Sequence, residues 1–514
     1  MRDNILGKKL WMAYESLTSR NGIASFLGHD FRDYFLGLVA FKYLSEKLEI
    51  FVDRELSKEK LSFEDAWEKE DYKSAIETRS LIELGYFIEP RLLFKNTLYE
   101  AKATGCILEN LDEALKKLGD SSIGKESEED FANIFEDVDL YTSKLGKDEK
   151  TRNSVILETM RQINGLNFNV EDEKINYLGD AYEYLIHQIS NKYGRESFYY
   201  TPKEISSLLA KIVSLDKDYL EKVYDPTCGS ASTLLELENE INVGEYFAQE
   251  IDHSAYNMAR MNMILHGIDY RKFDIELGDT LENPIHMGMT FDAIVSNPPA
   301  SASWSADEEF LNDERFSPYN ILAPKSKADY AFIQHMIHHL DDEGTMAVAV
   351  PLGVLYRGSR EQLIRKTLIE NNYLDAVIGL PNNLFYSTSI PVVILVFKKQ
   401  RNAQNILFID ASKDFEKKRK QNKLRSEDID KIMYAYNNRQ EIENYSANIS
   451  LENIRENDYN LNIPRYIDTY VERESVDVDK LYFRLGEISA EIKFVNEKIK
   501  ESSEKLNINL NLID

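Results

Sequence analysis

One stretch of the sequence has the pattern of a ligand-binding turn at the end of a parallel β-strand. The apolar run Lys222–Tyr224 is followed by Asp-Pro-Thr-Cys-Gly-Ser-Ala-Ser at residues 225–232, and a helix is predicted to begin at Thr233. Open α/β sheets bind ligands at such turns. The single glycine and the lack of a Gly-Lys-Ser/Thr sequence argue against a dinucleotide fingerprint and a P-loop. Asp225 would place a carboxylate where a ligand ammonium group could bind, although a purely structural turn has the same pattern.

Two more acids follow strand-like runs in the same register. Glu250 comes directly after the run Tyr246–Gln249, where an acid is placed to bind both hydroxyls of a ribose. Asp279 follows Gly278 after a third predicted strand, and its carboxylate could accept from the exocyclic amine of an adenine. A solvated acid at a strand end would look the same. The three acids together favour S-adenosylmethionine, which offers an ammonium group, a ribose and an adenine.

A rigid loop follows the fourth predicted strand, Phe291–Ser296. Its residues are Asn297, Pro298 and Pro299. The prolines fix φ and remove two N–H donors, so the loop presents acceptors: the Asn297 amide oxygen and the Pro298 carbonyl. Two acceptors could hold both hydrogens of an exocyclic –NH₂ and direct its lone pair toward an electrophilic methyl group. Such a nitrogen is a poor nucleophile, so positioning and electrostatics must do most of the catalysis.

These turns require an open sheet with helices on its faces. Short apolar runs alternate with helical segments after Leu166, which predicts an α/β fold with a Rossmann-like, mostly parallel sheet. The runs are Lys222–Tyr224, Tyr246–Gln249, Phe291–Ser296, Thr345–Pro351, Leu374–Leu380 and Pro391–Lys398. The last two runs are too close together for a crossover helix, so we expect an antiparallel pair at the sheet edge.

Helical regions are expected on both sides of this core. Residues 1–165 show no strand pattern, and one buried helix face is indicated by Leu36, Val39, Ala40, Tyr43, Leu44 and Leu48. We therefore predict a helical N-terminal domain at residues 1–165, a methyltransferase catalytic domain at 166–410 and a helical region at 411–514.

The end of the chain contains a heptad pattern. The apolar positions are Leu481, Leu485, Ile488, Ile492, Val495 and Ile499. Their spacing alternates between four and three residues, which is typical of a helix that packs in a coiled coil. This seam either packs on the chain's own domain or binds helices of another chain, and its narrow, terminal position favours the second interpretation.

Composition restricts the class of protein further. The chain has 514 residues, 43% hydrophobic and 29% charged, which is typical of a globular protein. Two cysteines, Cys106 and Cys228, cannot form a disulfide framework, so we expect a reducing, cytoplasmic location. The longest apolar stretches are too short to span a membrane, and the N-terminus lacks the apolar region of a signal peptide. The net charge of −27 argues against a protein that coats nucleic acid, although the basic segment Lys413–Arg425 is a candidate phosphate contact.

The order Asp-Pro-x-x-Gly and then Asn-Pro-Pro resembles the amino-methyltransferases of DNA. Further segments resemble the modification (M) subunits of type I restriction–modification systems, which are adenine-N6 DNA methyltransferases. These segments are Phe35–Ser45, Phe198–Lys203, Ala259–Gly267, Ala323–Phe332, Gly379–Phe385 and Asp458–Tyr466. The resemblance covers almost the whole chain.

This resemblance implies methyl transfer from S-adenosylmethionine to adenine N6 in duplex DNA, with no metal. Two M subunits would join one specificity (S) subunit, and a restriction (R) subunit would add ATP-driven translocation and cleavage. The implied cofactor residues are Phe198, Tyr199, Tyr200, Thr201, Pro202, Lys203, Gly229, Ser230, Ala231, Ser232 and Glu250, with Asp225 and Asp279 as additions. Asn297, Pro298 and Pro299 would hold the adenine.

One position departs from the family. After the second proline the family has Phe or Tyr, which stacks on the flipped-out base, whereas this chain has Ala300. Base–aromatic stacking contributes ~1–3 kcal/mol, so its loss should weaken adenine capture. Either Trp304 or Phe316 replaces the ring, or methylation is impaired, or the residue was changed deliberately.

Two other functions stay open from the residues. An N4-cytosine, RNA or protein-glutamine methyltransferase could also present its amine or amide to Asn-Pro-Pro, and a catalytically silent assembly subunit would be compatible with Ala300. We interpret His335, His338 and His339 as core or surface histidines, because no Glu or Cys complements them as metal ligands. Cys228 is interpreted as a small filler residue.

Overall fold

The computed structural model describes residues 4–20, 22–168, 170, 177–193, 201–385, 390–418, 421–468 and 478–506. Contacts within the chain divide it into two units, Met1–Ile467 and Asp468–Asp514. The first unit contains the N-terminal helices and the sheet, and the second contains one long helix. The domain boundaries expected after residues 165 and 410 stay predictions.

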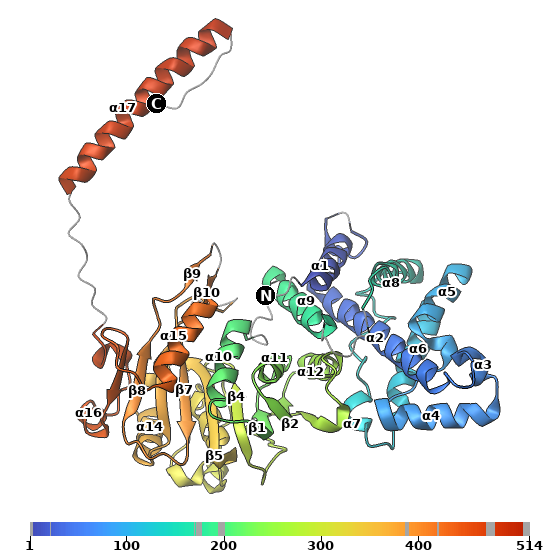
Figure 1. The fold of residues 1–514 in the computed structure, drawn as a ribbon, viewed down its shortest axis with the longest axis horizontal. Coiled ribbons are helices and arrows are strands. Elements are labelled where there is room, and N and C mark those ends of the chain that lie inside the picture. The colour runs from blue at the N-terminus through green and yellow to red at the C-terminus, as the bar shows by residue number, and fades with distance from the viewer. Residues whose placement is uncertain are drawn as a thin grey trace. The chain divides into compact units, whose positions relative to one another are not determined.

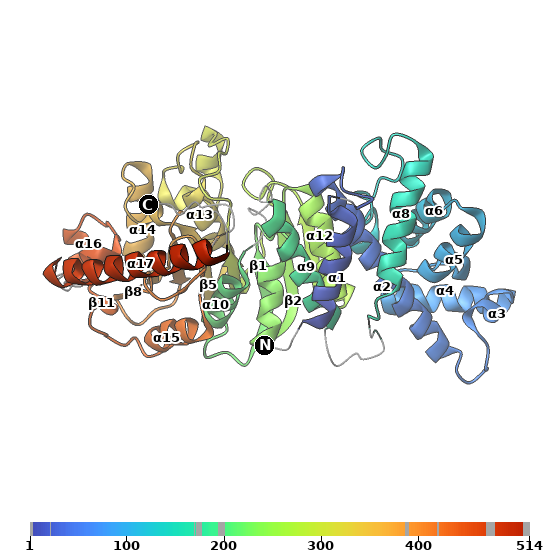
Figure 2. The ribbon, with the colours of Figure 1, turned by 90° about the horizontal axis from the view of Figure 1, so that it is seen from above.

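The N-terminal part of the first unit is helical, as predicted. Its helices are α1 (Ile5–Thr18), α2 (Phe31–Glu55), α3 (Phe63–Trp67), α4 (Glu70–Leu84), α5 (Phe94–Thr104), α6 (Leu108–Asp120), α7 (Glu128–Phe131) and α8 (Glu149–Asn164). Helix α2 buries all six positions of the predicted face, from Leu36 to Leu48. The helices α3 to α6 and α8 lie at the end of this unit away from β8 (Figures 1 and 2).

The remainder of the first unit is built on a nine-stranded sheet in the order β11-β8-β6-β7-β5-β4-β1-β2-β3. Its strands are β1 (Tyr219–Asp225), β2 (Asn242–Glu250), β3 (Phe273–Leu277), β4 (Phe291–Ser296), β5 (Leu340–Pro351), β6 (Leu374–Gly379), β7 (Val392–Lys398), β8 (Ile406–Asp410) and β11 (Ser446–Ile449). The four pairs β3–β2, β2–β1, β1–β4 and β4–β5 are parallel. The expected Rossmann-like α/β core is therefore confirmed, with the strand order reversing between β1 and β4.

The antiparallel pair β6–β7 is confirmed, but its predicted position at the sheet edge is wrong. Strand β7 is antiparallel to β5 as well as to β6, so it lies inside the sheet. Beyond β6 the sheet continues with β8, parallel to β6, and ends with β11, antiparallel to β8. Strand β11 shows no apolar run, because only Ser446 of its four residues is buried.

The two faces of the sheet are covered separately. Successive side chains of a strand point to opposite faces, and in β4 Ala293 and Val295 join one buried cluster while Ile294 joins the other. Because both faces are buried, the strands appear in the sequence as continuous apolar runs.

The sheet helices are α9 (Tyr177–Tyr193), α10 (Lys203–Val213), α11 (Ser232–Leu235), α12 (His253–Leu265), α13 (Asp329–His339), α14 (Arg360–Glu370), α15 (Ser426–Asn437) and α16 (Leu451–Glu456). Residues of α10, α12 and α15 belong to the first cluster, and residues of α13 and α14 belong to the second. A small hairpin, β9 (Glu416–Lys417) and β10 (Asn422–Lys423), precedes α15.

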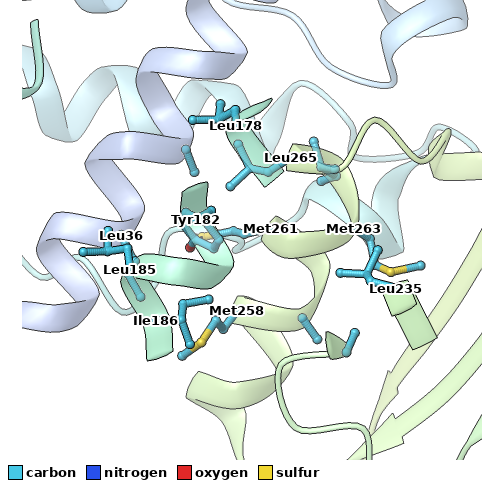
Figure 3. Packing of buried hydrophobic residues seen from close by; sticks show 14 of the residues in the cluster. Leu36, Leu178, Tyr182, Leu185, Ile186, Leu235, Met258, Met261, Met263 and Leu265 are labelled. Carbon is cyan, nitrogen blue, oxygen red and sulfur yellow. The ribbon is translucent and has the colours of Figure 1, made fainter. Parts of the chain in front are cut away.

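Helix α12 lies between the N-terminal helices and the sheet. Figure 3 shows Met261 beside Tyr182 of α9, and Met263 beside Leu235 of α11. The guanidinium of Arg260 in α12 donates from Nη1 to the backbone carbonyls of Glu129 in α7 (2.7 Å) and of Ala132 directly after it (3.1 Å). One helix therefore contacts both the N-terminal part and the core.

The second unit contains helix α17 (Val478–Leu506). All six seam positions are exposed, from 37% at Ile499 to 62% at Leu485. Among the described residues of this unit, none covers the predicted apolar stripe. Among the described residues, no helix is long and apolar enough to cross a membrane.

Candidate active site

The carboxyl ends of β1 and β4 meet at the point where the strand order reverses. Asp225 at the end of β1 is buried, and its Oδ1 accepts hydrogen bonds from the Thr227 amide (3.0 Å) and the Ser296 hydroxyl (2.8 Å) at the end of β4. Burial raises the pKa of Asp225 to about 7. The hydrogen bonds from Thr227 and Ser296 both reach Oδ1, and the second carboxylate oxygen can accept from a ligand.

Glu250 at the end of β2 holds the glycine turn. Its Oε2 accepts from the Gly229 amide and its Oε1 from the Asp252 amide, at 2.8 and 2.9 Å. Burial raises the pKa of this carboxyl group. Gly229 and Ala231 both have left-handed φ values, 56° and 61°, so the chain turns sharply before α11. The turn and Glu250 thus form one hydrogen-bonded unit.

Residues Ser230 and Ser232 of the turn face each other, with 2.8 Å between their hydroxyl oxygens. The Ser230 carbonyl accepts from the side-chain amide of Asn262 in α12 at 2.8 Å. Asn262 is fully buried, which makes this a strong positional restraint on the turn. Cys228 is also buried and burial raises its pKa well above the usual value, in agreement with a filler role.

Asp279 lies in the loop after β3, and its carboxylate also accepts hydrogen bonds from the backbone. Its Oδ1 accepts from the backbone amides of Leu281 and Glu282, at 2.9 and 3.2 Å. The preceding Gly278 amide donates to the Glu250 carbonyl at 2.8 Å, which brings this loop to the end of β2. The structure therefore gathers Asp225, Glu250 and Asp279 at one sheet edge.

Asn297 at the end of β4 contacts the segment predicted to bind the cofactor. Its Nδ2 donates to the Thr201 hydroxyl at 3.2 Å, which leaves the Asn297 amide oxygen to accept from a ligand. Pro298 is buried and Pro299 is exposed. Pro202 precedes α10, and Lys203 pairs with Glu236 at 2.8 Å. Phe198, Tyr199 and Tyr200 lie outside the described residues.

Ala300 is exposed beside these prolines. The two rings considered as its replacements are buried elsewhere: Trp304 and Phe316 pack against each other and against Phe310, with centroids 5.4–5.8 Å apart. The indole N–H of Trp304 donates to the Pro324 carbonyl at 3.3 Å. Both rings are thus part of the loop's own core.

Several residues that support the site were not predicted from the sequence. Thr227 and Ser296 join the ends of β1 and β4, with 2.8 Å between their hydroxyl oxygens. Arg315 is fully buried and donates to the carbonyls of Thr280 and Leu281, next to Asp279. Their positions near strand ends were available as a signal for Thr227 and Ser296, whereas Arg315 follows no motif.

The histidines of α13 include residues of the core. His335 is fully buried, where its Nδ1 accepts from Arg315 (3.1 Å) and its Nε2 contacts the Tyr224 hydroxyl (3.0 Å). Burial lowers the pKa of His335 well below its usual value, which keeps the imidazole neutral. His339 is buried and His338 is half-buried.

The basic segment contains several charges that are already paired. Lys418 pairs with Glu416 at 3.3 Å, Lys423 with Glu204 at 2.8 Å, and Arg425 with Asp428 at 2.8 Å. Arg419 and Lys420 lie outside the described residues. A phosphate contact by this segment stays a prediction.

Comparison with known proteins agrees with the site. The family model described as N-6 DNA Methylase matches residues 173–475, and the one described as HsdM N-terminal domain matches residues 6–163. The type I restriction enzyme MpnII methylase subunit of Mycoplasma pneumoniae is 34% identical, over 99% of this chain and 98% of the relative. The MjaVII methylase subunit of Methanocaldococcus jannaschii is 32% identical, over 67% of this chain and 62% of the relative.

A solved structure leads to the same assignment. The type I restriction-modification system methyltransferase subunit from Streptococcus thermophilus is 38% identical and superposes with a TM-score of 0.83, over 90% of this chain and 99% of that one. The expected family is confirmed. The chain belongs to the N-6 DNA methylase family and, within it, to the methyltransferase subunits of type I restriction–modification systems.

Proposed function

We propose that S-adenosylmethionine binds at the turn after β1 and that the loop after β4 presents adenine N6 of duplex DNA to it. In this arrangement Asp225 binds the ammonium group, Glu250 the ribose hydroxyls and Asp279 the adenine of the cofactor. Phe198 to Lys203, Gly229 and Ser230 to Ser232 would surround the cofactor. The bound cofactor would supply an electrophilic methyl group on a sulfonium.

One observation supports this proposal most directly. The hydrogen bond between Ser296 and Asp225 fixes the loop that carries Asn297 against the turn that carries the cofactor residues. The Thr201 hydroxyl accepts from Asn297 Nδ2, so the amide oxygen is oriented as an acceptor. The proposed methyl donor and the proposed methyl acceptor therefore belong to neighbouring strand ends.

The loop residues would act by orientation. The Asn297 amide oxygen and the Pro298 carbonyl accept hydrogen bonds from the two N–H groups of N6. These bonds align the nitrogen lone pair for attack on the methyl carbon. Held by Asp225, Glu250 and Asp279, the cofactor would supply the methyl group, with its sulfur as the leaving group. The amine then loses one proton to solvent, so no buried general base is required.

Glu250 provides the test of the cofactor assignment. Glu250→Ala removes a charged hydrogen-bond acceptor, which typically contributes ~1.5–3 kcal/mol, so affinity for S-adenosylmethionine should fall by about tenfold or more. Glu250→Gln retains the shape and one acceptor oxygen and should weaken binding less. Unchanged affinity of both variants in calorimetry would refute the ribose assignment. Mass analysis of methylated nucleosides separates N6-adenine from N4-cytosine products.

The proposed partners follow from the family. We expect the chain to assemble with a second copy, a specificity subunit and a restriction subunit on duplex DNA, in the cytoplasm. The exposed seam of α17 is the proposed contact with the specificity subunit, because a solvent-exposed apolar stripe requires a partner.

The silent assembly subunit remains the second candidate. Ala300 favours this silent subunit, because the rings of Trp304 and Phe316 are buried against each other and cannot stack on a base in its place. Comparing methyl transfer by the chain with that by its Ala300→Tyr variant distinguishes the two functions.

A further inference from the structure

A lysine contacts the loop that follows Asn-Pro-Pro. The ammonium group of Lys327 donates to the Ser301 hydroxyl, with 3.1 Å between Nζ and Oγ. Ser301 directly follows the exposed Ala300, and its backbone has a left-handed φ of 54°. Lys327 is half-buried, so the aliphatic part of its side chain packs against the protein. Its ammonium group lies close to the proposed base-binding loop.

The same segment fixes this loop by backbone contacts. The Ala328 amide donates to the Ala302 carbonyl at 2.8 Å, and the Ser301 amide donates to Oδ1 of the buried Asp329 at 3.0 Å. Lys327 is therefore attached to a rigid part of the site.

The charge of Lys327 is not compensated within the described part of the chain. Other cations close to the site are neutralised: Lys203 pairs with Glu236, and Arg357 pairs with Asp329 and Glu361. Lys327 forms no ion pair with a described carboxylate, and its polar partner is the neutral Ser301 hydroxyl. Lys327 can therefore offer its charge to an anionic ligand.

We infer that Lys327 binds a phosphate of the DNA backbone next to the target adenine; the inference rests on the proposed function. A flipped nucleotide remains attached to its two phosphates, so a cation beside the base-binding loop is close to one of them. An ammonium group binds phosphate as a compact point charge, and such contacts fix the register of the protein on the duplex. Lys327 would thus hold the nucleotide by its backbone where Ala300 offers no ring.

The salt dependence of DNA binding tests this contact. Loss of one phosphate contact makes the slope of log K against log salt shallower by about 0.9, where K is the association constant for DNA. Relative to 1 M salt, this corresponds to roughly eightfold weaker binding at 0.1 M salt. The full chain with its specificity subunit should show this change in Lys327→Gln, while Lys327→Arg should retain most of the affinity. Affinity for S-adenosylmethionine and the unfolding temperature should stay unchanged in both variants.

Lys325→Gln is the matched control. It removes the same charge two residues earlier, from an exposed side chain that does not contact Ser301. Equal slope changes in the two Gln variants would show diffuse attraction by the segment and overturn a specific contact. An unchanged slope in Lys327→Gln would also overturn it, as would a loss of activity caused by weaker cofactor binding alone.

Modified DNA locates the phosphate. After the methylated adenine has been mapped, a neutral methylphosphonate is placed at each flanking phosphate in turn. Each should weaken DNA binding by the protein that retains Lys327. At one of the two positions it should have little further effect on Lys327→Gln, because the same contact is already lost. Additive losses at both positions would overturn the inference. If the protein that retains Lys327 methylates no adenine, the proposed function itself fails, which is a separate result.

Discussion

The side-chain amide of Asn297 donates to the hydroxyl of Thr201, with 3.2 Å between Nδ2 and Oγ1. This bond joins the loop after β4 to the segment before α10, although the two residues are far apart in the sequence. It also orients the Asn297 amide, because Nδ2 lies at Thr201 and the amide oxygen points the other way.

Thr201→Val should therefore release the orientation of Asn297. A net hydrogen bond contributes ~0.5–1.5 kcal/mol, so kcat at saturating cofactor should fall by roughly three- to tenfold. Thr201→Ser keeps the hydroxyl and should retain most of the rate. If only the KM for S-adenosylmethionine changes, Thr201 acts on the cofactor and not through Asn297.

Asp225 should make cofactor binding depend on pH. Burial raises its pKa from 3.8 to about 7, so the folded chain without ligand holds this proton between about pH 4 and pH 7. The contribution of Asp225 to stability is present below about pH 4 and is lost as the pH rises to about 7, because ionisation of the buried group is unfavourable.

A ligand ammonium group would favour the ionised form. Affinity for S-adenosylmethionine should therefore increase as the pH rises, by about tenfold per pH unit below pH 7. Calorimetry at several pH values checks this, and Asp225→Asn should bind weakly with a flat profile in the same range. An equally steep profile in Asp225→Asn would assign the dependence to another group.

The seam of α17 should be required for assembly. Ile488→Asp combined with Ile492→Asp would bury two unpaired charges in a helix contact and should abolish co-purification with the specificity subunit. The control is Lys493→Asp with Lys498→Asp, which changes two charges away from the seam. Full recovery of the specificity subunit with the folded seam variant would contradict this assignment.

Ala300 should limit methyl transfer and little else. Ala300→Tyr or Ala300→Phe should raise the rate by roughly tenfold or more, which lies within the range of the stacking contribution. Cofactor affinity and assembly should not change, because neither uses the missing ring. A chain that already methylates at the restored rate would show that another ring stacks on the base.

The parts of the fold that were predicted are those that bury apolar side chains. Strand β4 was predicted with its observed bounds, Phe291–Ser296, because both its faces are covered. The edge strand β11 was missed because backbone hydrogen bonds to β8 hold it, and these leave no hydrophobic pattern. The position of β7 inside the sheet was missed for a different reason, since an apolar run predicts a strand but not the strands that pair with it.

The site follows the same rule. Asp225, Glu250 and Asn297 were predicted because the strand ends are recognisable and each residue type has a chemical use there. Asn262 and Arg315 support the site from distant parts of the chain, through bonds to backbone carbonyls. Any residue with N–H groups can form such bonds, so proximity created by the fold is the only evidence for them.

Helix α12 connects the N-terminal helix α7 to the proposed cofactor turn. Arg260 binds carbonyls next to α7, and Asn262 binds the carbonyl of Ser230 in the cofactor turn. Because both sets of bonds come from one helix, we expect α7 and the turn to open together, so that a ligand that stabilises one also protects the other. Saturation with S-adenosylmethionine should therefore slow amide hydrogen exchange in α7 as well as in the turn, and Asn262→Ala should remove the protection of α7.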